Sequence, residues 1–135
     1  MRAQSRDQLL QSIAWIGQVP VGRGMVLFPE HDEYSASALR EACAEVRDVF
    51  VARPRRRLGV ATAIMDELER AAGGHGMHIV GLSVALDDDA EAARALYDRL
   101  GYRHAHGPYV SSANCEGDEG PIAVGSVIDY LVKDL

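Results

Sequence analysis

The residues best suited to chemistry lie in one stretch, RPRRRLGVATA, which runs from Arg53 to Ala63. Arginines are followed at once by Gly59 and Ala61, and then by a helical pattern. At a strand–loop–helix junction several backbone N–H groups point to one place, and the helix dipole adds partial positive charge. Gly59 and Ala61 let a pyrophosphate approach the backbone, and arginine side chains add charge-assisted hydrogen bonds. The stretch predicts a phosphate site; the alternative is a solvated basic loop in which Gly59 only eases the turn.

Known phosphate-binding patterns do not fit this stretch. It contains neither GxxxxGK[ST] nor GxGxxG, which disfavours a Walker A loop and a dinucleotide-binding fold. The chain of 135 residues has a formal net charge of −6, whereas nucleic-acid-binding domains are normally basic. We therefore expect a protein that does not bind nucleic acid. The length of the chain predicts a single domain spanning residues 1–135.

Composition further limits the class of protein. Two cysteines, Cys43 and Cys115, do not make a disulfide framework, and we expect reduced thiols in a cytoplasmic protein. The beginning of the chain, MRAQSRDQLL, lacks a signal-peptide stretch, and no apolar run is long enough to span a membrane. His104, His106 and Cys115 lack a fourth ligand and tight spacing, so we expect no metal site.

The elements that must hold the phosphate site follow from hydrophobic periodicity and turn residues. The expected strands cover residues 12–16, 21–28, 45–52, 77–86, 102–104 and 122–132. The expected helices cover residues 58–72, stopped by Gly73 and Gly74, and 90–100, capped from residues 87–89, with a short helix in 29–44 and a loop over 111–120. This order predicts one mixed sheet with helices packed on it.

Two motifs in this frame resemble the Gcn5-related N-acetyltransferase (GNAT) superfamily. Arg56-x-x-Gly59-x-Ala61 matches the family's Q/R-x-x-G-x-G/A signature for the acetyl-CoA pyrophosphate. ARALYDRLGY, from Ala93 to Tyr102, looks like its A-x-x-L-Y-x-x-x-G-F/Y segment. The likeness begins near residue 12, and it implies a mostly antiparallel sheet with a central parallel splay, flanking helices and a shortened beginning.

The resemblance also implies the cofactor and the residues that hold it. Acetyl-CoA would lie in the splay, with its pantetheine arm paired with the backbone of residues 49–51 and its leaving thiolate protonated by Tyr97. The family's cofactor contacts carry over to Val49, Phe50, Val51, Arg56, Arg57, Leu58, Gly59, Val60, Ala61, Thr62 and Tyr97. For Tyr97 the alternative is an aromatic residue at the boundary between a helix and the core.

The expected reaction is acyl transfer to a primary amine of a small cationic molecule, a lysine or an N-terminus. Glu45 stands eleven residues before Arg56, the separation of the base glutamate in histone-type members of the family. Asp48 is its competitor, expected on the opposite face because strand side chains alternate. Either can simply be a solvated carboxylate at the start of a strand.

The acceptor side departs from the family. Only residues 1–10 precede the hairpin, where the family usually has a strand and helices that wall the acceptor, so residues 29–44 or a second subunit must replace them. We therefore expect a homodimer.

The family's asparagine falls at Ala90, and the loop proline is displaced to Pro54. Glu116, Asp118 and Glu119 lie in the loop that borders the acceptor in this family and suggest a cationic acceptor, unless they are only solvated.

Three functions remain open on the sequence. The leading one is an acetyl-CoA-dependent N-acetyltransferase. The second is a regulatory or partner subunit that binds CoA without catalysis, favoured by the short beginning and disfavoured by Tyr97. The third is a nucleic-acid binder using Arg53, Arg55, Arg56 and Arg57, disfavoured by the acidic total and the lack of interleaved aromatics.

Overall fold

The structure is a computed structural model that describes residues 9–28, 43–56 and 59–135. The chain divides into two compact units, residues 1–82 with 133–135 and residues 83–132. Each unit is described by itself. The expected short helix in residues 29–44 lies outside the described residues, except that Cys43 and Ala44 belong to a strand.

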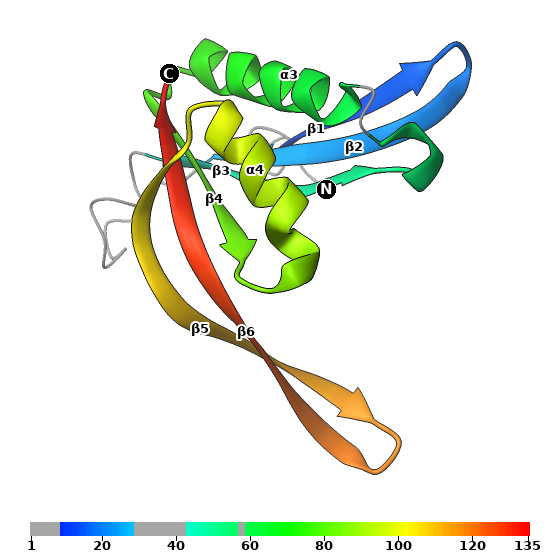
Figure 1. The fold of residues 1–135 in the computed structure, drawn as a ribbon, viewed down its shortest axis with the longest axis vertical. Coiled ribbons are helices and arrows are strands. Elements are labelled where there is room, and N and C mark those ends of the chain that lie inside the picture. The colour runs from blue at the N-terminus through cyan, green and yellow to red at the C-terminus, as the bar shows by residue number, and fades with distance from the viewer. Residues whose placement is uncertain (1–8, 29–42, 57–58) are drawn as a thin grey trace. The chain divides into compact units, whose positions relative to one another are not determined.

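The first unit is a sheet with one long helix on one face (Figure 1). Its elements are β1 (Leu9–Ile16), β2 (Val19–Leu27), β3 (Cys43–Val51), the 3₁₀ turn η1 (Arg53–Arg55), α3 (Val60–Gly74) and the start of β4 (Ile79–Ala85). The strands lie in the order β1-β2-β3-β4, antiparallel except for the parallel pair of β3 and β4. This mostly antiparallel sheet with one parallel pair confirms the predicted mixed class.

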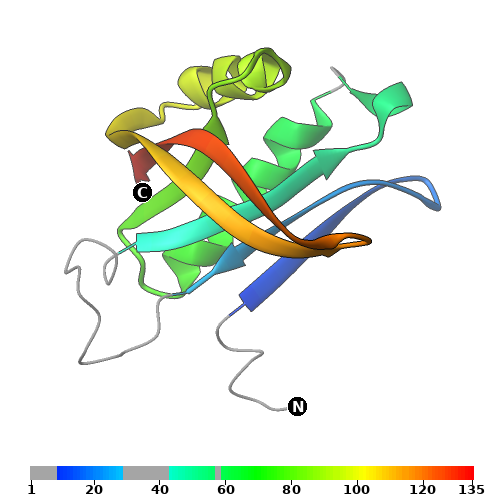
Figure 2. The same ribbon diagram turned by 90° about the horizontal axis from the view of Figure 1, so that it is seen from below.

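The core of the first unit lies between α3 and the sheet (Figure 2). Ile64, Met65 and Leu68 of α3 are at most 2% exposed. The predicted helix is confirmed, and its buried residues follow helical spacing along one face: Val60, Ile64, Met65, Leu68 and Ala72. The strands contribute mostly small and β-branched residues, which suit a tightly packed sheet surface, together with Leu82: Val26, Ala44, Val46, Val51 and Val80.

Two glycines of β2 allow this helix to lie close to the sheet. A Cβ at Gly22 would stand 2.9 Å from Cδ1 of Ile64. A Cβ at Gly24 would stand 2.8 Å from Cγ2 of Ile64 and 3.0 Å from Cδ1 of Leu68. Since real Cβ atoms do not approach so closely, a larger residue at either position would force the side chains of α3 or the helix itself to shift.

The end of α3 differs from the prediction, because Gly73 and Gly74 lie inside the helix. The N–H of Met77 donates to the carbonyl of Ala72 at 3.1 Å, and Gly76 has a φ of +81°. This is the Schellman arrangement, which needs a left-handed residue just past the helix. Gly76 supplies that residue, so the helix continues beyond the two glycines expected to stop it.

The second unit holds the remainder of β4, the 3₁₀ turn η2 (Asp88–Ala90), α4 (Glu91–Arg99), β5 (Arg103–Gly117) and most of β6 (Gly120–Asp134). Its strands lie in the order β4-β6-β5. The predicted cap lies one element earlier than expected. Oδ1 of Asp87 accepts the N–H of Ala90 at 3.0 Å and caps η2, whereas α4 has Ala90 at its N-cap and no side-chain cap. The last residues of β6 return to the first unit, where Nζ of Lys133 lies 2.6 Å from Oε1 of Glu69.

The predicted loop over residues 111–120 is wrong, because β5 continues to Gly117 and only Asp118 and Glu119 form the turn. SSANCEG carries no apolar alternation of its own. Its partner does, since Ile122 and Val124 lie two residues apart on β6. The partner strand therefore imposes the extended backbone on a polar segment, as strand propensity depends on context.

Substitution of Gly24 tests the helix-to-sheet contact. We expect Gly24→Ala to lower the free energy of unfolding by about 1–3 kcal/mol, because the methyl group overpacks the core against Ile64 and Leu68. Gly73→Ala is the matched control: no atom lies within 4 Å of its Cβ position, and it should raise stability by about 0.5–1 kcal/mol. Urea unfolding measures both, and equal effects would contradict the close approach.

Candidate functional site

The junction between β3 and α3 carries most of the predicted cofactor residues. Gly59 precedes the helix with a φ of +80°, and apart from its chain neighbours no atom of the described residues lies within 4 Å of its Cβ position. The carbonyl of Gly59 accepts the first helical hydrogen bond, from the N–H of Ala63 at 3.0 Å. The N-cap residue, a glycine, supplies no side-chain hydrogen bond, and no acidic residue lies in the first turn of α3. The junction is therefore open and suited to an anion.

The free donors at this junction belong to Val60, Ala61 and Thr62. They are the first residues of α3, and the first N–H groups of an α-helix have no partner within it. These three residues are among those that the sequence assigned to the cofactor. Arg57 and Leu58, assigned with them, lie outside the described residues.

A β-bulge interrupts β3 just before its last residues. The register between β2 and β3 shifts between Arg23 and Met25, and Asp48 has a φ of +55°. The bulge invalidates the argument that placed Asp48 opposite Glu45, since strict alternation does not continue through it. The sequence gives one weak signal, because aspartate is disfavoured in strands and tolerates the left-handed region better than most residues.

Beyond the bulge, Val51 turns its backbone polar groups away from β2. The N–H of the next residue, Ala52, donates to the carbonyl of Val21 at 2.8 Å. Because successive residues of an antiparallel ladder alternate between bonding to the partner and facing away, the N–H and C=O of Val51 face the other edge of β3. Within the first unit, the pairing of β3 with β4 covers only Cys43–Val46 and Ile79–Leu82.

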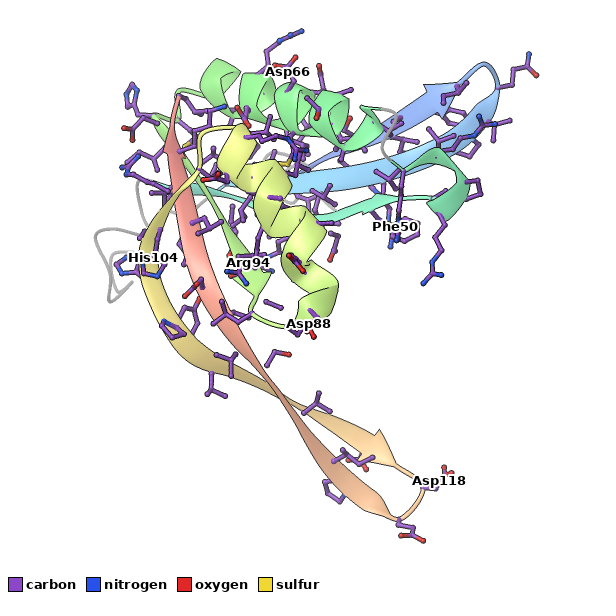
Figure 3. All side chains as sticks on the ribbon, in the orientation of Figure 1. Phe50, Asp66, Asp88, Arg94, His104 and Asp118 are labelled. Carbon is purple, nitrogen blue, oxygen red and sulfur yellow. The ribbon has the colours of Figure 1, made fainter. Side chains whose placement is uncertain are left out.

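The side chain of Arg56 lies against this strand end. Its Nε donates to the carbonyl oxygen of Val51 at 3.0 Å, and its guanidinium carbon lies 5.8 Å from the centre of the Phe50 ring. Figure 3 shows the Phe50 side chain on the side of β3 turned away from α3. The sequence predicted Arg56 as a phosphate ligand and Phe50 as a cofactor residue, and no pattern in it indicated that the two side chains meet.

The candidate base, Glu45, is paired with an arginine of its own strand. Its Oε2 lies 2.7 Å from Nη2 and 2.9 Å from Nε of Arg47. The side chain of Glu45 is 28% exposed, so water can still reach it. Glu45 and the junction residues belong to the same unit, and the role of Glu45 stays a prediction.

Tyr97 lies on α4 in the second unit and is partly buried. Its ring meets that of Tyr102 at 5.8 Å between centres with 63° between planes, and Tyr102 is 5% exposed. Burial raises the pKa of the Tyr97 hydroxyl above its usual value of 10.0. Tyr97 therefore carries its proton at neutral pH, as a general acid must.

An open hollow of about 830 Å³ in the second unit does not include Tyr97. Arg94 and Asp98 of α4 line it, together with Leu131 of β6. Figure 3 shows Arg94 on α4. Nε2 of His104 and Oδ1 of Asp129 lie 3.3 Å apart at its edge. Among residues 9–28, 43–56 and 59–135, no three potential metal ligands form a group.

The acidic residues expected near the acceptor lie at the tip of the β5–β6 hairpin. Asp118 and Glu119 form its turn, Glu116 lies in the last part of β5, and all three are exposed. Figure 3 shows Asp118 at the end of the hairpin. In the part of the chain that the structure describes, no helix is both long and apolar enough to cross a membrane.

Solved structures with the same fold are acetyltransferases. The IAA acetyltransferase of Bacillus cereus ATCC 14579 matches 95% of this chain and 79% of its own length, with a TM-score of 0.67 and 16% identity. The ribosomal-protein-alanine N-acetyltransferase of Brucella melitensis matches 98% and 72%, with a TM-score of 0.67 and 17% identity. PaiA N-acetyltransferase of Thermoplasma acidophilum, solved with coenzyme A, matches 99% and 65%, with a TM-score of 0.67 and 13% identity.

At these identities the structures show the fold alone. A search of curated proteins found no match. The sequence itself matches the family described as acetyltransferase (GNAT) family over residues 2–102, which is most of the chain. Enzymes of this family use acetyl-CoA as the acetyl donor. The chain therefore belongs to the acetyltransferase (GNAT) family, as its two motifs indicated.

Proposed function

We propose that the chain is an acetyl-CoA-dependent N-acetyltransferase, and that residues 1–135 work as one domain. The observation that carries the proposal is the junction at Gly59. It combines a helix whose N-cap residue supplies no side-chain cap, a left-handed glycine at that N-cap and, three residues earlier, an arginine held against the carbonyl of Val51. This combination suits the pyrophosphate of CoA, because backbone N–H groups and a guanidinium donate to the same anion.

The backbone of β3 would hold the rest of the donor. The edge of Val51 that faces away from β2 supports pairing with the amide groups of the pantetheine arm. Its N–H would donate to the thioester carbonyl and stabilise negative charge as the acetyl group is attacked. The carbonyl of Val51 already accepts Nε of Arg56, so the arm would take its acceptors from the preceding residues of β3.

In the proposed reaction the nitrogen of a neutral amine attacks the thioester carbonyl. The C–S bond breaks as the C–N bond forms, the nitrogen loses a proton and the CoA sulfur gains one. Glu45, directly or through water, would accept the proton from nitrogen, and Tyr97 would donate a proton to sulfur. The raised pKa of Tyr97 supports this role, since it keeps the donor protonated.

The proposed acceptor is a primary amine of a cationic molecule, a lysine or an N-terminus. Support comes from the exposed carboxylates of Glu116, Asp118 and Glu119 and from the net charge of −6. Such a surface attracts cations and raises their local concentration.

The first test is calorimetry with acetyl-CoA, followed by release of free thiol in the presence of a panel of amines. We expect one donor bound per chain and thiol release with cationic amines. Binding without release by any amine would instead support a CoA-binding subunit without catalysis. No binding of acetyl-CoA would overturn the proposal.

Gly59→Asp should abolish CoA binding, which corresponds to a loss of affinity of about a hundredfold or more. The change places a carboxylate where the phosphates would lie, and aspartate tolerates the left-handed backbone better than most residues. Gly76→Asp is the matched control at the other end of α3, with a φ of +81° and equally open space. Calorimetry compares the two, and unchanged affinity in Gly59→Asp would contradict the phosphate site.

Tyr97→Phe should lower kcat about a hundredfold, the lower end of general acid contributions, and leave the Kd of acetyl-CoA unchanged. In the wild type, the hydroxyl loses its proton only as the pH rises above 10, because its pKa is raised. The contribution of Tyr97 to kcat is therefore at its full value at neutral pH and decreases at alkaline pH, as the hydroxyl loses its proton. A pH profile measures this decline, and its survival in Tyr97→Phe would exclude Tyr97 as the acid.

We also propose that the chain works as a homodimer. Ile13 and Trp15 of β1, two residues apart in the strand, are 50% and 57% exposed, and such apolar side chains support association. Trp15→Glu should shift the mass measured by light scattering from dimer to monomer. Gln11→Glu, on the same strand, is the control for added charge, and a wild-type monomer would contradict the proposal.

A further inference from the structure

The side chain of Arg56 is held at two points, unlike the other described arginines of its loop. Its Nε donates to the carbonyl of Val51 at 3.0 Å, and its guanidinium lies 5.8 Å from the centre of the Phe50 ring. All three of these arginines are exposed, but Arg53 and Arg55 make no side-chain contact of this kind within the described residues. Of these three arginines, only Arg56 has its orientation fixed before any ligand arrives.

The position of Phe50 is not explained by packing. Phe50 pairs with Arg23 across the ladder, on the face of β3 opposite the buried Val51, and its side chain is 50% exposed. A half-exposed aromatic ring contributes little to the core. It does offer its electron-rich face to a cation, an interaction whose strength is greatest when water is excluded.

We propose that Phe50 is a positioning residue that holds Arg56 ready to bind a phosphate group of acetyl-CoA. The inference rests on the proposed function, in which the backbone of β3 holds the pantetheine arm. It adds a second role for β3, in which the side chain of Phe50 positions Arg56. The Val51 carbonyl fixes Nε, and the Phe50 ring limits the rotation of the guanidinium plane. The remaining N–H groups are then presented to an anion with less loss of side-chain entropy on binding.

Two acetyl donors distinguish this role from a general structural one. Acetyl-CoA carries the phosphates, whereas S-acetylpantetheine has the same thioester arm without them. Phe50→Leu should weaken acetyl-CoA about two- to fivefold, the fold-change expected for an exposed cation–π contact, and leave S-acetylpantetheine unchanged. Phe50→Tyr keeps an aromatic face and should restore the wild-type affinity.

Control variants distinguish the specific effect of Arg56 and Phe50 from the effect of losing any positive charge or any aromatic ring. Arg56→Ala should weaken acetyl-CoA about tenfold or more, and Arg55→Ala, which removes the same charge, should have a much smaller effect. Phe28→Leu removes the ring that stacks on His75 at 4.3 Å, and it should change neither affinity. Circular dichroism and the thermal midpoint confirm that each variant is folded.

A double-mutant cycle completes the test. If Phe50 acts through Arg56, Phe50→Leu should have no further effect on acetyl-CoA affinity in an Arg56→Ala background. Additive effects, or equal weakening of both donors by Phe50→Leu, would overturn the inference, since the ring would then act on the arm or on the fold. A wild type that binds S-acetylpantetheine and acetyl-CoA equally would overturn it too. Failure to bind acetyl-CoA at all would overturn the proposed function with it.

Discussion

The close contact of α3 with β2 is the constraint on which the first unit depends. Gly22 and Gly24 let Ile64 and Leu68 reach the backbone of the strand, and larger residues would push the helix away. Because the helix is fixed in this place, its first turn lies where β3 ends. The proposed phosphate site would thus depend on how α3 packs against β2, as well as on the N–H groups that would bind the ligand.

Three irregular structural features lie close together at the end of β3. The bulge at Asp48 changes the register between β2 and β3, and the backbone N–H and C=O of Val51 then point away from β2. The side chain of Arg56 donates to the Val51 carbonyl. Each is a small departure from regular structure, and bulges are often found where a strand must present a group to a ligand. In the proposed reaction Tyr97 would contribute in a different way, through burial that raises the pKa of its hydroxyl and keeps it protonated.

The sequence predicted the elements with strong periodicity and the residues with a recognisable motif. The β1–β2 hairpin, α3, β4 and the junction at Gly59 follow from local patterns of apolar residues and glycine. The length of β5 could not be predicted from SSANCEG, because the register with β6 imposes its extended form. The continuation of α3 through Gly73 and Gly74 was missed, since the Schellman bond to Met77 decides the end of the helix. The contact of Arg56 with Phe50 depends on side-chain directions after a bulge, for which the sequence gives no signal.

The return of residues 133–135 to the first unit affects the order of folding during synthesis. Lys133 pairs with Glu69, and the N–H of Leu135 donates to the carbonyl of His78 at 2.9 Å. These are contacts of high sequence separation, so the loop that contains residues 83–132 must be closed before they form. Although β1, β2, β3 and α3 leave the ribosome early, the first unit can complete its contacts only after the whole second unit has been synthesised.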